Sequence, residues 1–150
     1  MVDKMVIRRA QHNDLNAMAG LLEELFGIED DFAIDVEKQI RGLYLLLKAP
    51  NAFLYVAKYK NRVIGMISMQ QMISTAMGGY VGLIEDLIVS SDFRSRGVGR
   101  LLLEAIITKS VQLGYSRLAL GADERNHTAI AFYRTFGFEM SNMGLMYHMR

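Results

Sequence analysis

The chain has 150 residues, a length typical of one domain that can bury its own core. Its net charge of +1 lacks the basic excess of a dedicated nucleic-acid binder, and the absence of cysteine excludes disulfides, thiolate metal sites and cysteine nucleophiles. No apolar run is long enough to cross a membrane. We therefore expect one cytoplasmic domain over residues 1–150, with no nucleic-acid or membrane partner.

Apolar periodicity predicts the elements of the first half. A short strand is expected first, and two helices follow with apolar residues at every third or fourth position. The second helix ends before Pro50, because the residue before a proline avoids helical geometry. Two strands joined by a short turn then predict a hairpin. These elements cover residues 5–10, about 15–26, 36–47, 52–59 and 62–74.

The second half predicts a strand, a helix that ends near Gly114, another strand, a short helix and one or two closing strands. The strands cover residues 80–89, 115–122 and 138–150, and the short helix covers 127–136. Consecutive strands in the middle of the chain favour antiparallel pairing, whereas the strand–helix–strand unit favours a local parallel crossover. The order predicts a mixed α+β fold with a largely antiparallel sheet flanked by helices.

The junction "RSRGVGR", residues 94–100, has the composition of an anion site. The start of a helix presents backbone N–H groups without partners, and glycine lets a phosphate approach them. Arg94, Arg96 and Arg100 can add charge-assisted hydrogen bonds. The alternative is a tight turn with solvated arginines. Two nucleotide-binding patterns do not fit, because the P-loop sequence is missing and Leu102 occupies the third glycine of the dinucleotide fingerprint.

Two motifs together resemble the GNAT superfamily of N-acetyltransferases. The first, R/Q-x-x-G-x-G/A, matches Arg94, Gly97 and Gly99. The second, N-x-x-A-x-x-F-Y-x-x-x-G-F, is matched at every position by "NHTAIAFYRTFGF", residues 126–138. The motifs are separated by one helix and one strand, as in that family, and the order of elements is similar over nearly the whole chain.

The resemblance implies acetyl-CoA as the donor, with its pyrophosphate on the loop and its pantetheine arm beside a strand that separates from its neighbour at a bulge. Asn126 would bond the arm or its surroundings. The backbone N–H near Leu87 or Ile88 would stabilise the oxyanion. The implied donor-binding residues are Leu87, Ile88, Val89, Arg94, Ser95, Arg96, Gly97, Val98, Gly99, Arg100, Asn126, Ala129, Phe132 and Tyr133.

Attack of an amine on a thioester needs a proton acceptor and a proton donor. By resemblance, Tyr133 is the expected acid that protonates the leaving thiolate; the alternative is an aromatic core residue. Glu85 is the candidate base, because a carboxylate inside the apolar strand "LIEDLIV" is costly without a use or a partner. Alternation places Glu85 and Asp86 on opposite faces. A structural carboxylate is the alternative for Glu85.

The acceptor is predicted from charge. By resemblance, the first two helices and their connection form a wall of its site, and here the connection carries Glu29, Asp30 and Asp31. An acidic wall would attract a cationic amine; the alternative is a solvated loop. The three histidines have no metal-ligand spacing, so no metal is expected.

The leading hypothesis is an N-acetyltransferase that acts on a primary amine of a small metabolite or a peptide, either as a monomer or as a homodimer. The alternative is a non-catalytic acyl-CoA-binding sensor or regulatory module.

Overall fold

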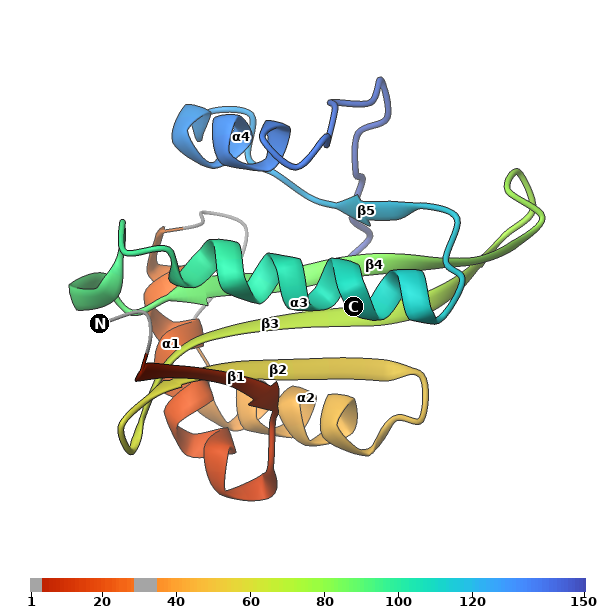
Figure 1. Cartoon of the computed structure of the whole chain (residues 1–150). Helices are drawn as coiled ribbons and strands as arrows, with labels where there is room; N and C mark the ends of the chain where they lie inside the picture. Colours follow the sequence, from red (N-terminus) through yellow and green to blue (C-terminus); the bar gives the residue numbers. More distant parts are fainter. Residues whose placement is uncertain (1–3, 29–34) are drawn as a thin grey trace.

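A computed structural model of the chain describes residues 4–28 and 35–150 (Figure 1). The predicted substrate residues Glu29, Asp30 and Asp31 therefore lie outside the described residues. The strands are β1 (Met5–Arg9), β2 (Ala52–Tyr59), β3 (Arg62–Ser74), β4 (Gly79–Val89) and β5 (Leu118–Leu120). The helices are α1 (Leu15–Ile28), α2 (Val36–Lys48), α3 (Val98–Gln112) and α4 (His127–Arg134), with short 3-10 turns η2 (His12–Asp14) and η3 (Ser91–Phe93).

The strands form one sheet in the order β1-β2-β3-β4-β5. The first four strands pair antiparallel, and β4 pairs with β5 in parallel. The predictions of a central hairpin, a parallel crossover and a mixed α+β fold are confirmed. Parallel pairing requires a long connection, and α3 supplies it between β4 and β5.

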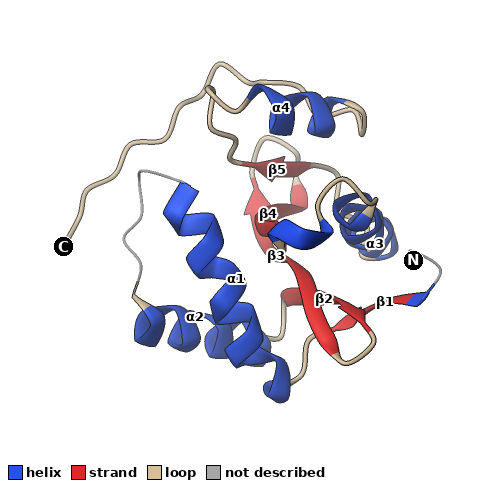
Figure 2. Cartoon of the chain, turned by 90° about the vertical axis from the view of Figure 1, so that its left-hand side faces the viewer, coloured by secondary structure: helices blue, strands red, loops and turns tan. Residues whose placement is uncertain are grey.

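Helices cover both faces of the sheet, so the core has two parts (Figure 2). Helices α1 and α2 pack on one face, where Met18, Leu22 and Leu43 meet Met66 of β3. Helix α3 packs on the other face, where Leu102 and Ile106 meet residues of β2, β3 and β4. Each of these helices buries its apolar side against one face of the sheet, which explains its amphipathic periodicity.

Local capping decides where several helices begin and end. Asp35 begins α2, because its carboxylate accepts a hydrogen bond of 3.1 Å from the backbone N–H of Lys38. The helix ends at Lys48, before Pro50, as the sequence predicts. Helix α3 follows Gly97, which has a left-handed φ of 85°. A glycine suits that conformation because it has no Cβ.

The prediction of closing strands within residues 138–150 is wrong for this structure. The structure describes this segment without helix or strand, and its residues from 139 onward are exposed. The predicted strand over 115–122 is also shorter, because only Leu118–Leu120 pair with β4. A strand requires a partner edge as well as a sequence pattern, and in this chain the tail meets none.

Candidate functional site

A cleft of about 690 Å³ opens where β4 and β5 separate. The two strands pair only from Gly82 to Ile84 on β4 and from Leu118 to Leu120 on β5. Beyond that point the cleft is lined on one side by the rest of β4, and on the other by Leu120 at the end of β5 and residues 121–123 that follow it. It extends to the beginning of α3 and to α4. The two motifs of the sequence therefore border one cavity.

A bulge in β4 accompanies this separation. The register between β3 and β4 shifts between Met66 and Ser68, and Asp86 has a left-handed φ of 55°. A β-bulge bends its strand and redirects the side chains around it. The prediction that Glu85 and Asp86 lie on opposite faces assumed a regular strand. The bulge interrupts the alternation, and both residues line the cleft.

Glu85 lies directly opposite Ser68 across the β3–β4 ladder. The Ser68 hydroxyl donates a hydrogen bond of 3.0 Å to the backbone carbonyl of Glu85, so the carboxylate itself is not used in that contact. The Glu85 side chain is exposed and borders the cleft. A group in this place can accept a proton from a molecule that enters from solvent.

Tyr133 approaches the cleft from α4. Its ring contacts those of Phe132, at 5.4 Å between centroids, and Phe138, at 6.0 Å, in edge-to-face geometry. Asn126 begins the same helix, where its side-chain oxygen accepts a hydrogen bond of 3.1 Å from the backbone N–H of Ala129. The amide nitrogen of Asn126 takes no part in this cap and can donate a hydrogen bond to a ligand.

The loop before α3 places several backbone N–H groups at one end of the cleft. Ser95 and Gly97 both have left-handed φ, of 60° and 85°. The first N–H groups of α3, from Val98 to Arg100, have no partner within the helix, and the helix dipole adds positive potential there. Such a nest of N–H groups is a suitable binding place for a phosphate.

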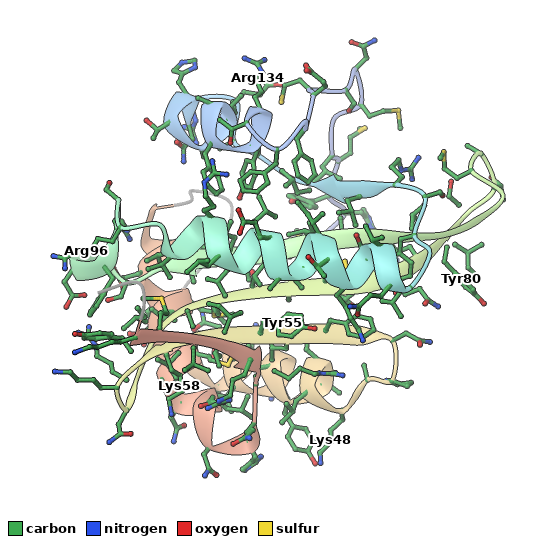
Figure 3. The ribbon with its side chains drawn as sticks, in the orientation of Figure 1. Lys48, Tyr55, Lys58, Tyr80, Arg96 and Arg134 are labelled. Atoms are coloured by element: carbon green, nitrogen blue, oxygen red, sulfur yellow. The ribbon has the colours of Figure 1, made fainter. Side chains whose placement is uncertain are left out.

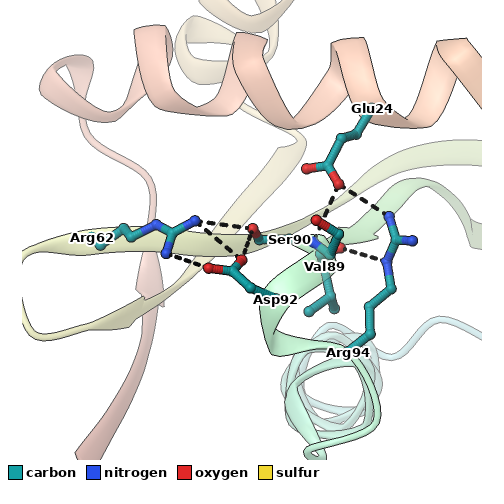
Figure 4. A network of polar contacts seen from close by, with 7 residues as sticks. Glu24, Arg62, Val89, Ser90, Asp92 and Arg94 are labelled. Carbon is teal, nitrogen blue, oxygen red and sulfur yellow. Dashed lines mark hydrogen bonds and ion pairs between the residues drawn. The ribbon is translucent and has the colours of Figure 1, made fainter.

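Three arginines, two in this loop and one in the first turn of α3, contact protein groups. Arg94 donates hydrogen bonds to the Val89 carbonyl at 3.1 Å and to Glu24 at 3.3 Å (Figure 4). Arg96 lies beside the beginning of α3 at the edge of the molecule, with its guanidinium 5.7 Å from the ring centre of Phe93 (Figure 3).

Arg100 joins two elements of the cleft. It donates to the Thr135 hydroxyl at 3.3 Å and lies 4.6 Å from the ring centre of Phe136. Its guanidinium thereby connects α3 to the end of α4.

A further ion pair, between Arg62 and Asp92, lies at the turn η3 just before this loop. Arg62 and Ser90 both donate hydrogen bonds to Asp92, with distances of 2.8 Å and 2.6 Å (Figure 4). These bonds lower the pKa of Asp92 to about 2, from an ordinary value of 3.8. In the cleft itself, hydrogen bonds from Arg125 to the lining residue Asp123 lower the pKa of that carboxyl to about 2.

Most of the residues that were expected to bind acetyl-CoA line this one cleft. Arg96 is the exception, because it does not border the cavity. The cleft also contains residues that sequence reasoning missed, which are Leu25, Ile84, Asp86, Phe93, Leu120, Gly121, Ala122, Asp123 and Thr128. Residues 120–123 could have been predicted from the expected sheet topology. Because neighbouring parallel strands end at the same edge, the residues after β5 are expected opposite the end of β4.

The model of the acetyltransferase (GNAT) family matches residues 16–138 of this chain. The chain belongs to this family. The predictions of the family and of an acetyl-CoA-dependent acetyltransferase class are thereby confirmed. The matched region includes both motifs and the whole cleft, and it ends at Phe138, immediately before the exposed tail.

Individual proteins agree with this assignment. The chain is 25% identical over 141 residues to an uncharacterized N-acetyltransferase of Methanocaldococcus jannaschii, covering 93% of this chain and 62% of that protein. It is 25% identical over 136 residues to the aminoalkylphosphonate N-acetyltransferase of Salmonella typhimurium, covering 91% of this chain and 86% of that protein. The chain thus spans less than two thirds of the first of these proteins.

A solved structure shows the same fold. It is an aminoglycoside acetyltransferase from an uncultured soil metagenomic sample in complex with sisomicin, with a TM-score of 0.79 and 21% identity over 99% of both chains.

Among residues 4–28 and 35–150, no group of three or more His, Asp or Glu side chains is placed to hold a metal ion. In the same described part of the chain, no helix is long and apolar enough to cross a membrane.

Proposed function

We propose that this chain transfers an acetyl group from acetyl-CoA to a primary amine in a ternary complex. The observation that carries the proposal is the cleft between β4 and β5, which has a phosphate-binding nest at one end and both Glu85 and Tyr133 on its walls. The nest, formed by the loop and the first turn of α3, would hold the pyrophosphate. The edge of β4 from Leu87 to Val89 would pair with the pantetheine arm.

Acetyl-CoA supplies an activated acyl group, and the protein supplies the proton transfers and the placement. Glu85 accepts a proton from the amine, directly or through a water molecule. The new C–N bond forms as the C–S bond breaks, and the phenolic O–H of Tyr133 protonates the departing sulfur. A backbone N–H at the bulge near Leu87 or Ile88 donates to the carbonyl oxygen as negative charge develops there.

The acceptor class is the finer part of the proposal. The Salmonella relative acts on aminoalkylphosphonates, and the structural neighbour binds sisomicin, an aminoglycoside. Both names support a small amine as the acceptor. Glu29, Asp30 and Asp31 would favour a cationic amine, and the cytoplasmic location and the homodimer stay predictions.

The test is release of free thiol from acetyl-CoA with a panel of amines, which covers polyamines, amino acids, aminoglycosides, amino sugars, aminoalkylphosphonates and peptides. Release with one class, lost in Glu85→Gln and retained in Glu37→Gln on α2, supports an enzyme that uses Glu85. Binding of acetyl-CoA without release for any amine supports the alternative, an acyl-CoA sensor.

The charge of the acceptor has its own test. Neutralising Glu29, Asp30 and Asp31 together removes three charges, each worth about 0.2–1 kcal/mol to an exposed pair. KM for a cationic acceptor is expected to rise roughly threefold to a hundredfold, while KM for acetyl-CoA barely changes. Added salt should raise the acceptor KM of the parent more than that of the triple variant. Equal acceptor KM values for the parent and the triple variant, each at low and at high salt, would contradict an acidic wall.

A further inference from the structure

A second hollow, of about 480 Å³, lies beside α1 and shares none of its lining residues with the cleft between β4 and β5. It is bordered by η2 and one side of α1, by the β2–β3 turn and by Ser90 after β4. Figure 3 shows Lys58, one of its lining residues, next to α1. Sites for small molecules usually have volumes of a few hundred Å³, so a small ligand fits here.

Small residues of α1 keep this hollow open. Ala17, Gly20 and Glu24 line it at a spacing that places them on one face of the helix. A glycine inside a helix lowers stability relative to alanine. A Cβ built at Gly20 would meet no neighbouring atom within 4 Å, so the packing of the fold does not require a glycine there. The missing side chain at residue 20 leaves space in the hollow instead.

Two charged groups at this hollow have unused hydrogen-bonding capacity. Glu24 accepts hydrogen bonds from Arg94 and from the backbone N–H of Ser91, both at Oε1. Its other oxygen, Oε2, has no hydrogen-bond partner among the residues that the structure describes. Across the same described residues, the Nζ of Lys58 has neither a hydrogen bond nor an ion pair. An ammonium group can therefore bind to Glu24, and a carboxylate can bind to Lys58.

The opposite charges at the hollow do not neutralise each other by contact. Figure 4 shows Arg62 and Glu24 on opposite sides of Ser90, and Arg62 pairs with Asp92 rather than with Glu24. The pKa of Arg62 is raised mainly by its hydrogen bond to Asp92 and further by the charge of Glu24. A simple cation or a simple anion would meet a like charge here, whereas a molecule with one positive and one negative end complements both.

We propose that this hollow is a second ligand site, which binds a small zwitterion of the amino-acid class with its ammonium on Glu24 and its carboxylate on Lys58. Because Glu24 also accepts hydrogen bonds from Arg94 and Ser91, a bound ammonium holds this carboxylate where it supports the loop before α3. Occupancy is therefore expected to tighten the binding of coenzyme A. This second effect rests on the proposed function, which places the pyrophosphate on that loop.

The first experiment follows the backbone amide NMR signals of the whole chain, in the absence of acetyl-CoA, while ω-amino acids are added. The probes are glycine, β-alanine, γ-aminobutyrate and ε-aminohexanoate, which place the two charges at increasing separation. The best-fitting probe should shift the signals of Gly20 and Asn61 at the hollow, while those of Gly121 and Ala122 in the cleft stay in place.

Single-charge molecules are the controls for these probes. The alkylamine and the carboxylic acid of the same length as the best probe each carry one of its charges, and each should bind about three- to tenfold more weakly. If no probe shifts Gly20 and Asn61, or if the shifts are confined to the cleft, the proposal is wrong.

The second experiment fills the hollow. Gly20→Leu places a side chain in the open space, and because leucine favours a helix, the fold should be retained with an equal or higher Tm. This variant should lose the signal shift of Asn61. Gly42→Leu on α2, where a Cβ also meets no neighbour within 4 Å, is the matched control and should bind as the parent does. Unchanged affinity in Gly20→Leu would place the bound probe elsewhere and overturn the proposal.

The charge of Lys58 is tested in the same way. Lys58→Met keeps the length of the side chain without its ammonium and should weaken binding of the best probe by about three- to tenfold. Lys60→Met in the β2–β3 turn, which does not line the hollow, is the matched control and should bind as the parent does. Equal affinities in Lys58→Met and the parent would contradict the carboxylate contact.

The third experiment measures the coupling by calorimetry. The Kd for coenzyme A should fall about fivefold at saturating probe, in the parent and in Gly42→Leu but not in Gly20→Leu. By reciprocity, coenzyme A should tighten the binding of the probe by the same factor. If the parent does not bind coenzyme A at all, the proposed function is wrong and the zwitterion site stands on the first two experiments. If coenzyme A binds with a Kd that the probe does not change, only the coupling is overturned.

Discussion

Glu24 of α1 and Arg94 of the loop before α3 form a hydrogen-bonded ion pair, with 3.3 Å between Glu24 Oε1 and Arg94 Nη2, although they are 70 residues apart in the chain (Figure 4). The same carboxylate oxygen accepts a hydrogen bond of 3.2 Å from the backbone N–H of Ser91. Arg94 also holds the Val89 carbonyl at the end of β4. The Arg94 side chain thereby joins α1, the end of β4 and the loop before α3. Its task is to position these elements within the protein.

The first prediction concerns this task of Arg94. Arg94→Gln keeps a donor for the Val89 carbonyl and should leave the Kd for coenzyme A nearly unchanged. Arg94→Ala removes the contact, and because the pair is partly exposed, Kd should rise only about three- to tenfold. Isothermal titration calorimetry at two salt concentrations measures the Kd for coenzyme A of both variants. If Arg94 instead binds phosphate through its charge, Gln and Ala would lose affinity equally and the salt dependence would fall in both.

The second prediction concerns Gly99. A Cβ built there would lie 3.7 Å from Phe132 and 3.8 Å from Val89, which are ordinary contacts, so the fold itself does not require a glycine. Gly99→Val should therefore remain folded and lose coenzyme A binding, because its side chain occupies the approach of the phosphate. In the parent, ligand at 100 times Kd adds about 2.7 kcal/mol, or roughly 5–10 °C in Tm.

The control for Gly99 is Gly42→Val on α2, where a Cβ would meet open space. This variant has the same change in helix propensity and should keep the full ligand-induced shift in Tm. An undiminished shift in Gly99→Val would show that the phosphate does not approach this residue.

The third prediction concerns Tyr133. Tyr133→Phe removes only the hydroxyl, so the ring contacts with Phe132 and Phe138 persist. If the hydroxyl is the general acid, kcat should fall by about 10²–10⁴ while the Kd for acetyl-CoA is unchanged. Tyr44→Phe on the exposed side of α2 is the matched control. Full turnover in Tyr133→Phe would assign this tyrosine to packing alone.

The fourth prediction concerns pH and Asp92. Its pKa in the folded protein is lowered to about 2, below the ordinary 3.8, through hydrogen bonds from Arg62 and Ser90. Ionised Asp92 therefore stabilises the fold above the unfolded pKa, and this contribution is lost as the pH falls from about 3.8 to about 2. The difference in free energy of unfolding between the parent and Asp92→Asn should be present at neutral pH and shrink as the pH falls through about 2.

Denaturant unfolding followed by circular dichroism measures this difference across the acid range. Arg62→Gln should reproduce part of the effect of Asp92→Asn, because it removes the ion pair but leaves the hydrogen bond from Ser90 to Asp92. A difference that is constant with pH would show that Asp92 acts through its neutral hydrogen bonds.

The sequence by itself determined the helices, most strands and the two motifs. These depend on local physics: apolar periodicity, the turn at Gly97 and the cap at Asn126 are set by residues near each other in the chain. Donor residues in two motifs could therefore be named in advance, and all but Arg96 lie on one cleft.

Only the tertiary structure decided how those local parts meet. The bulge at Asp86 breaks the alternation because the β3–β4 register shifts there, and register depends on the partner strand. Glu24 could not be matched to Arg94 from spacing, since their contact requires α1 to pack beside the end of β4. The tail from 139 to 150 has the pattern of a strand, yet it forms none in this chain. Pattern gives a strand its two faces, but only a neighbouring edge can satisfy its backbone hydrogen bonds.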